Sequence, residues 1–108
     1  MRALEVRGKK LGILISCAPG ATGFRHGVRL AAAAMQRGVN VYLYCIDEAV
    51  AGVADPELQT LKAGGLNFYA CAYGAHKRNQ PLTDHATFAG LTVVNDLIVG
   101  TDRFVSFN

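Results

Sequence analysis

The residue best placed for chemistry in this chain is the cysteine at position 71. It ends an apolar, strand-like run that begins at Leu66, and small residues follow it. Three basic side chains come next, at His76, Lys77 and Arg78. Nearby cations and the N–H groups at the start of a helix favour a thiolate, which is the nucleophilic form of cysteine. We therefore expect a reachable thiol at the exposed end of this strand, with the three bases as candidates for binding or stabilising its charge.

Composition alone favours a simpler interpretation, in which Cys71 is an inert cysteine at a strand end. A phosphatase-type C-x5-R cradle does not fit, because Lys77 is the sixth residue after Cys71 and arginine comes one position later. Tyr73 could line a pocket beside the thiol, or serve as a surface aromatic for docking. Both alternatives stay open on these residues.

The other cysteines differ in their surroundings. Cys17 borders a loop and is a candidate second thiol, whereas Cys45 lies inside an apolar run and is expected to pack as a small hydrophobic residue. The chain has no C-x-x-C pair, and its histidines do not fall into ligand spacing with any cysteine, so we expect no metal site. Because no signal peptide is visible, we expect free thiols in a reducing cytoplasm.

A glycine-containing loop, Ala18–Gly23, precedes a predicted helix and is a candidate anion site through Gly20, Thr22 and Gly23. It lacks the Gly-Lys-Ser/Thr of a Walker loop, and it lacks the G-x-G-x-x-G of a dinucleotide site. A plain strand-to-helix turn is the favoured interpretation.

Strands and helices are predicted to alternate along the chain. The expected strands are 11–17, 39–46, 67–71, 91–94 and 103–107. The expected helices are 22–37, stopped by Gly38, one from Asp55-Pro56 to Gly64-Gly65, and a short turn opening at Asn95-Asp96. This alternation predicts a three-layer α/β/α fold with a mainly parallel five-stranded sheet. The carboxyl ends of parallel strands share one edge, which is where ligands bind in such folds.

The size and charge of the chain limit its function further. Its 108 residues fit one domain, and an apolar fraction of 51% with 18% charged residues is typical of an ordered globular protein. The net charge of +3 is accounted for within the first ten residues, so we divide the chain into a basic leader, 1–9, and a single domain, 10–108. A short basic leader does not make a nucleic-acid surface, and no segment is expected to span a membrane.

The order of these features resembles the DsrE/DsrF family of sulfur-relay proteins, which includes TusD-type sulfur carriers. The likeness covers nearly the whole chain from Lys10 onward. It rests on the Ala-rich helix ending in Arg37-Gly38, the segment 44–50 (YCIDEAV), Cys71 followed by small residues and Arg78, and the terminal segment 102–107 (DRFVSF). The family's arginine is often followed by glycine, and Asn79 stands there in this chain.

The resemblance implies a DsrE-like fold and a function. Cys71 matches the family's sulfur-carrying position, which implies a persulfide on Cys71, sulfur donor and acceptor proteins as partners, and no cofactor. Family members also include subunits without an active cysteine, so a non-catalytic subunit, or a binding module for a small anion or nucleotide, is the alternative. The family commonly forms trimers or hexamers, and a homo-oligomer is expected to bury aromatic residues such as Tyr42, Tyr69, Phe104 and Phe107.

Overall fold

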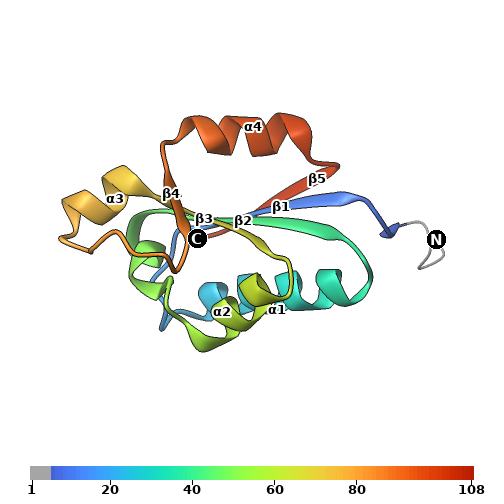
Figure 1. The fold of residues 1–108 in the computed structure, drawn as a ribbon, viewed down its shortest axis with the longest axis horizontal. Coiled ribbons are helices and arrows are strands. Elements are labelled where there is room, and N and C mark those ends of the chain that lie inside the picture. The colour runs from blue at the N-terminus through green and yellow to red at the C-terminus, as the bar shows by residue number, and fades with distance from the viewer. Residues whose placement is uncertain (1–5) are drawn as a thin grey trace.

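The centre of the molecule is a parallel sheet with helices on both faces (Figure 1). This computed structural model describes residues 6–108, and in them the elements run β1 (Lys10–Ile15), α1 (Thr22–Gln36), β2 (Asn40–Cys45), the 3-10 helix η2 (Asp47–Gly52), α2 (Pro56–Ala63), β3 (Asn67–Cys71), α3 (Ala72–Lys77), β4 (Thr87–Ala89), α4 (Thr92–Gly100) and β5 (Arg103–Phe107). The strand order is β4-β3-β2-β1-β5, and every pairing is parallel. The predicted three-layer fold with a five-stranded parallel sheet is confirmed.

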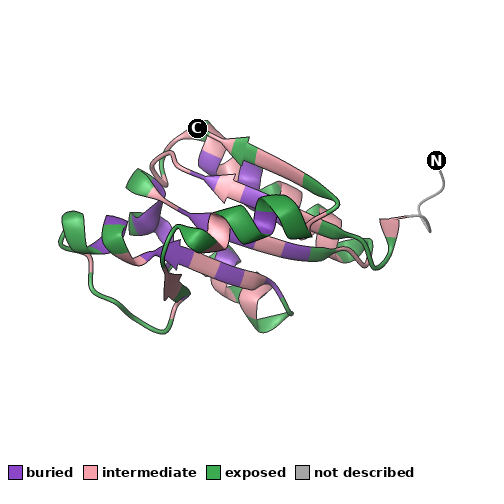
Figure 2. Cartoon of the chain, turned by 90° about the horizontal axis from the view of Figure 1, so that it is seen from above, coloured by how far each residue is buried: buried purple, intermediate pink, exposed green. Residues whose placement is uncertain are grey.

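The two faces of the sheet carry separate apolar clusters, because successive side chains of a strand point to opposite sides. One face holds Ile13, Leu43 and Phe68 and is covered by α1 and α2. The other face holds Tyr44 and Cys71 and is covered by α4 (Figure 1). The buried residues of the sheet lie in the three central strands, β1, β2 and β3, and further buried residues lie on the helices and connections that cover them (Figure 2). The candidate thiol therefore belongs to the smaller cluster, on the α4 face.

The segment between β3 and β5 differs from the prediction. Residues 91–94 were expected to form a strand, but Thr92–Gly100 is helix α4, and β4 is the three-residue strand just before it. Leu97 is buried on the sheet, with Val93 and Val94 packed in the same cluster. This spacing puts the three side chains on one helical face, and their packing against the sheet outweighs the strand preference of the β-branched residues.

The first nine residues were expected to form a basic leader before the domain. Residues 1–5 of that leader lie outside the described part of the chain. Residues 6–9 form a turn, in which the Gly8 backbone N–H donates to the Gly38 carbonyl at 2.9 Å. Gly38 itself has a φ of 80°, the left-handed conformation that glycine adopts readily after a helix.

Helix α2 begins at a capping aspartate, as its sequence predicts. The Asp55 carboxylate accepts hydrogen bonds from the backbone N–H groups of Glu57 and Leu58, at 3.1 and 3.3 Å. It also pairs with the Arg25 guanidinium of α1 at 2.7 Å. Arg25 holds the pKa of the Asp55 carboxyl below its usual range, mainly through this bond. One side chain therefore starts α2 and ties it to α1.

Substituting Asp55 by alanine is expected to lower the free energy of unfolding by about 2 kcal/mol, through loss of the cap and of the ion pair. Because the folded pKa is depressed, this contribution is complete above the unfolded value of about 4 and disappears as the pH falls through the folded value. Urea unfolding of Asp55→Ala at neutral and acid pH measures both effects. Glu57→Ala is the control, since its exposed carboxylate contributes little, and equal stability of the two variants at neutral pH would contradict the prediction.

Candidate active site at Cys71

The parallel strands β1, β2 and β3 have their carboxyl ends at the same end of the sheet. A cysteine lies at or near each of these three carboxyl ends. Cys45 and Cys71 are the last residues of β2 and β3, and Cys17 follows β1 by two positions. This arrangement agrees with the expectation that parallel strands bring their carboxyl ends together. The three thiols nevertheless have different surroundings.

Cys71 is nearly buried, with only 4% of its surface exposed. It precedes α3 as its N-cap, and the Gly74 backbone N–H donates to its Sγ at 3.2 Å. The expectation of a thiol open to solvent at the strand end is therefore wrong for this structure. The physical reason is that segments far apart in the sequence, around Val50 and Leu97, pack into the same cluster as Cys71.

The first turn of α3 fits closely around the sulfur. A Cβ added at Gly74 would lie 3.6 Å from the Cys71 Sγ and 3.5 Å from a Val50 methyl group. These are ordinary van der Waals distances, so a methyl group at position 74 would fit against the sulfur and Val50. A polar N–H and apolar carbon atoms thus share the space beside the thiol.

Tyr44 is a site residue that the sequence analysis missed. It is fully buried, and its hydroxyl donates toward the carbonyls of Ala89 and Gly90, at 3.0 and 3.2 Å. Burial raises the pKa of this phenol, and the neighbouring Cys71 sulfur raises it further. The sequence signal for it is weak, namely the alternation of Tyr42 and Tyr44 along β2, which puts both side chains on one face of the sheet.

The three bases lie away from the sulfur. His76 and Lys77 are exposed in the last turn of α3, the end opposite Cys71, where a cation agrees with the helix dipole. Arg78 is half-buried and pairs with Asp47 at 3.9 Å. Among the described residues, no hydrogen bond joins these bases to Cys71, and the polar contact to its Sγ comes from Gly74. Their part in stabilising the thiolate stays a prediction.

Tyr73 is two-thirds exposed, at the start of α3. It therefore stands on the surface next to the buried thiol. Whether it lines a pocket or docks a partner stays a prediction, and its exposure agrees with the second interpretation.

Cys17 and Cys71 lie on opposite faces of the sheet. Cys17 is half-buried against the α1-side cluster, with its thiol 3.8 Å from the Phe107 carbonyl oxygen. Strands β1 and β3 are separated by β2, about 10 Å in all, which is too far for a disulfide without backbone movement. Cys45 is fully buried, and burial raises the pKa of its thiol. The structure therefore does not bring a second cysteine to Cys71.

The candidate anion loop leads into α1. Gly20 is exposed, and Thr22 and Gly23 begin the helix without a side-chain cap. A Cβ added at Gly23 would lie 3.0 Å from the Cys17 Sγ, so close packing accounts for this glycine. An anion at this loop stays a prediction.

The solved structures include one with a similar fold. The crystal structure of the ychN protein from E. coli superposes with a TM-score of 0.80 at 20% sequence identity, covering 92% of this chain and 99% of that one. The fold of this chain is DsrE-like. No protein-family model and no curated protein matches the sequence. At this identity the likeness establishes the fold and leaves the function to be argued from the site.

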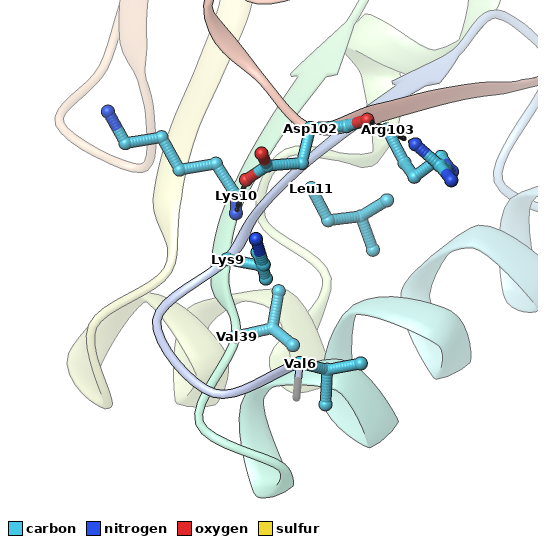
Figure 3. Close-up of a pocket in the computed structure, with 7 residues that line it drawn as sticks. All are labelled: Val6, Lys9, Lys10, Leu11, Val39, Asp102 and Arg103. Atoms are coloured by element: carbon cyan, nitrogen blue, oxygen red, sulfur yellow. Dashed lines mark hydrogen bonds between the residues drawn. The ribbon is translucent and has the colours of Figure 1, made fainter. Parts of the chain in front are cut away.

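One cavity lies at the opposite end of the sheet from Cys71, at the amino-terminal ends of the strands. It measures about 400 Å³ and opens where β1 and β5 begin, with Leu11 and Val39 beside Lys9 and Arg103 (Figure 3). There the Asp102 carboxylate accepts a hydrogen bond from the Lys10 backbone N–H at 2.7 Å. The cavity is therefore separate from Cys71.

Two further findings concern the described residues. They contain no cluster of three or more histidine, cysteine or acidic side chains that could hold a metal ion. None of the helices in residues 6–108 is long and apolar enough to cross a membrane.

Proposed function

We propose that this protein is a cytoplasmic sulfur carrier that holds sulfane sulfur as a persulfide on Cys71. The observation that carries the proposal is the Cys71 sulfur at the carboxyl edge of a DsrE-like sheet, with a backbone N–H directed at it from 3.2 Å. A hydrogen bond to sulfur favours the charged form over the neutral thiol. The position of Cys71 in the chain also matches the sulfur-carrying position of the family that the sequence resembles.

The transfer is a thiol exchange between this protein and its partners. The Cys71 thiolate attacks the outer sulfur of a donor persulfide, and a new S–S bond forms as the donor's S–S bond breaks. The bonding electron pair leaves with the donor's inner sulfur, which departs as a thiolate. The reaction needs no external oxidant, metal or nucleotide. An acceptor thiolate then removes the outer sulfur from Cys71 in the same way.

The basic residues after Cys71 fit a role in partner docking. His76 and Lys77 are exposed at the end of α3, and Tyr73 is exposed at its start. One short helix thus presents an exposed aromatic side chain near the thiol and two basic side chains at its far end. We propose that sulfur donor and acceptor proteins contact this helix.

We also propose that the protein is a homo-oligomer, as a trimer or hexamer. The aromatic residues expected at the interface, Tyr42, Tyr69, Phe104 and Phe107, are half-buried within the single chain. Three apolar side chains of α4 are more exposed than these aromatic residues. They are Leu91, at the start of the helix, and Ile98 and Val99 within it. The outer side of α4 is therefore the better candidate for contact between copies (Figure 2).

Incubation with glutathione persulfide, followed by intact-mass measurement, tests the carrier proposal. We expect the wild-type protein to gain one sulfur atom, which cyanide removes as thiocyanate. Cys71→Ser is expected to gain none, whereas the control Cys17→Ser is expected to load like the wild type. Equal loading of wild type and Cys71→Ser, or no loading of either, would overturn the proposal in favour of a non-catalytic subunit.

A further inference from the structure

The Tyr44 side chain crosses the strand that carries Cys71. Tyr44 of β2 is paired with Tyr69 of β3, and Cys71 lies two residues further along β3 on the same face of the sheet. Cys71 is in turn paired with Ala89 of β4. Because the Tyr44 hydroxyl reaches the Ala89 carbonyl, the phenol ring passes over β3 at the level of Cys71. The two side chains belong to one buried cluster.

The Tyr44 hydroxyl has more potential hydrogen-bond acceptors around it than it has protons to donate. It carries a single proton, and the carbonyls of Ala89 and Gly90 lie 3.0 and 3.2 Å away. The Cys71 sulfur belongs to the same buried cluster and is a further potential acceptor, a strong one once the thiol has lost its proton. Burial and the charge on Cys71 both raise the pKa of Tyr44, so the phenol keeps its proton when the thiol ionises.

We propose that the Tyr44 hydroxyl donates a hydrogen bond to the Cys71 thiolate, and that it holds the β4–α4 connection closed while Cys71 is protonated. The inference rests on the proposed function only in taking Cys71 as the reacting thiol. On ionisation, the thiol proton leaves to solvent base, and the hydroxyl turns from the carbonyls to the sulfur. In this way ionisation of Cys71 loosens the β4–α4 connection that covers it.

The released carbonyls belong to the segment that covers the site. The Gly90 carbonyl also accepts from the Val93 N–H at 3.2 Å, in the first turn of α4. The Tyr44 bond therefore ties β2 to the start of α4. When that bond is given up, the connection at residues 89–91 loses a hydrogen bond at each of two carbonyls and is held less firmly. This gives a partner a route to a thiol that is 4% exposed in the closed form.

Other titratable groups near Cys71 are less suited to this role. Those on the elements packed around it are Tyr42 of β2, Tyr69 of β3, Tyr73, His76 and Lys77 of α3, Arg78 after it, Asp47 and Glu48 of η2 and Asp96 of α4. All of them are half-buried or exposed, whereas Tyr44 is fully buried. A buried hydroxyl stabilises a neighbouring thiolate more strongly than an exposed charge does, because water does not compete for the bond.

The pH dependence of Cys71 alkylation tests the donor role, and amide hydrogen exchange tests the closing role. Rates with iodoacetamide are measured in a Cys17→Ser background, with and without Tyr44→Phe, which keeps the ring and removes the hydroxyl. Loss of the donor is expected to raise the midpoint of the profile by about one pH unit, a roughly tenfold lower rate at pH values below it. Loss of the closing bond is expected to speed hydrogen exchange of the Val93 and Val94 amides severalfold at pH values below the midpoint, where the wild type keeps that bond.

Tyr42→Phe is the matched control, since Tyr42 lies on the same face of β2 and is expected to leave the profile unchanged. An unshifted midpoint in Tyr44→Phe overturns the donor role, and unchanged exchange of the Val93 and Val94 amides below the midpoint overturns the closing role. If Tyr44→Phe does not fold, hydrogen exchange of the Val93 and Val94 amides in the wild type replaces it. Their protection is expected to fall as the pH passes the thiol midpoint, and to stay constant in Cys71→Ser; constant protection in both overturns the proposal.

The result is distinguishable from failure of the carrier proposal. A shifted alkylation profile without sulfur loading supports the Tyr44 inference and overturns the carrier. Sulfur loading with an unshifted profile supports the carrier and overturns the role of Tyr44.

Discussion

Alkylation of the folded protein is expected to modify Cys17 first, Cys71 more slowly and Cys45 at least about a thousandfold more slowly than Cys17. Cys17 is half-buried beside a loop, so a reagent reaches it with little movement. Cys45 is fully buried in β2, between β1 and β3, and its exposure requires the sheet to come apart. Its rate is therefore limited by global unfolding, which is rare in a stable domain.

Cys71 is expected between these extremes, about tenfold to a hundredfold slower than Cys17. Its cover consists of α3, η2 and the start of α4, which can open locally while the central strands stay paired. Rates are compared at a pH where all accessible thiols are ionised, by digestion and mass analysis of each cysteine peptide. In denaturant the three rates are expected to converge, which serves as the control.

The alkylation order also decides whether a carrier is physically possible here. If Cys71 reacts as slowly as Cys45, then only global unfolding exposes it, and no partner protein could exchange sulfur with it. If Cys71 reacts at an intermediate rate, local opening is sufficient. The buried position in the closed structure is then compatible with exchange.

The sequence predicts most of the fold because its signals are local. The apolar runs give β1, β2, β3 and β5, and Asp55-Pro56 marks the start of α2. Gly38 follows the helix where a stop was expected, and it adopts the left-handed conformation. Each of these features is decided by a few neighbouring residues.

The prediction fails where distant contacts decide the outcome. Residues 91–94 are β-branched enough to suggest a strand, yet Val93 and Leu97 share a helical face that packs on the sheet. The burial of Cys71 has no local signal at all, because Val50 and Leu97 come from other parts of the chain to cover it. Tyr44 was overlooked for the same reason: its partners, Ala89 and Gly90, are 45 and 46 residues away.

Substituting Ile98 by glutamate is expected to convert the proposed homo-oligomer to monomer, raising its dissociation constant at least about a hundredfold. Ile98 and Val99 are 55% and 78% exposed on the outer side of α4, and Leu91 extends the same apolar surface. The one charged side chain of this helix is Asp96, so little charge repulsion opposes contact between two copies. A carboxylate at position 98 would be buried without a partner in every copy of such an interface.

The same change is expected to leave the single chain stable. Ile98 is exposed, and glutamate is a good helix former, so neither the core nor the helix is disturbed. Ala33→Glu is the matched control, because Ala33 is exposed on α1, on the opposite face of the sheet. Sedimentation velocity over a wide concentration range measures the result. A monomeric wild type contradicts the oligomer itself. An oligomeric Ile98→Glu variant with the wild-type mass excludes α4 as the contact, because an interface that includes α4 would leave the new carboxylate without water.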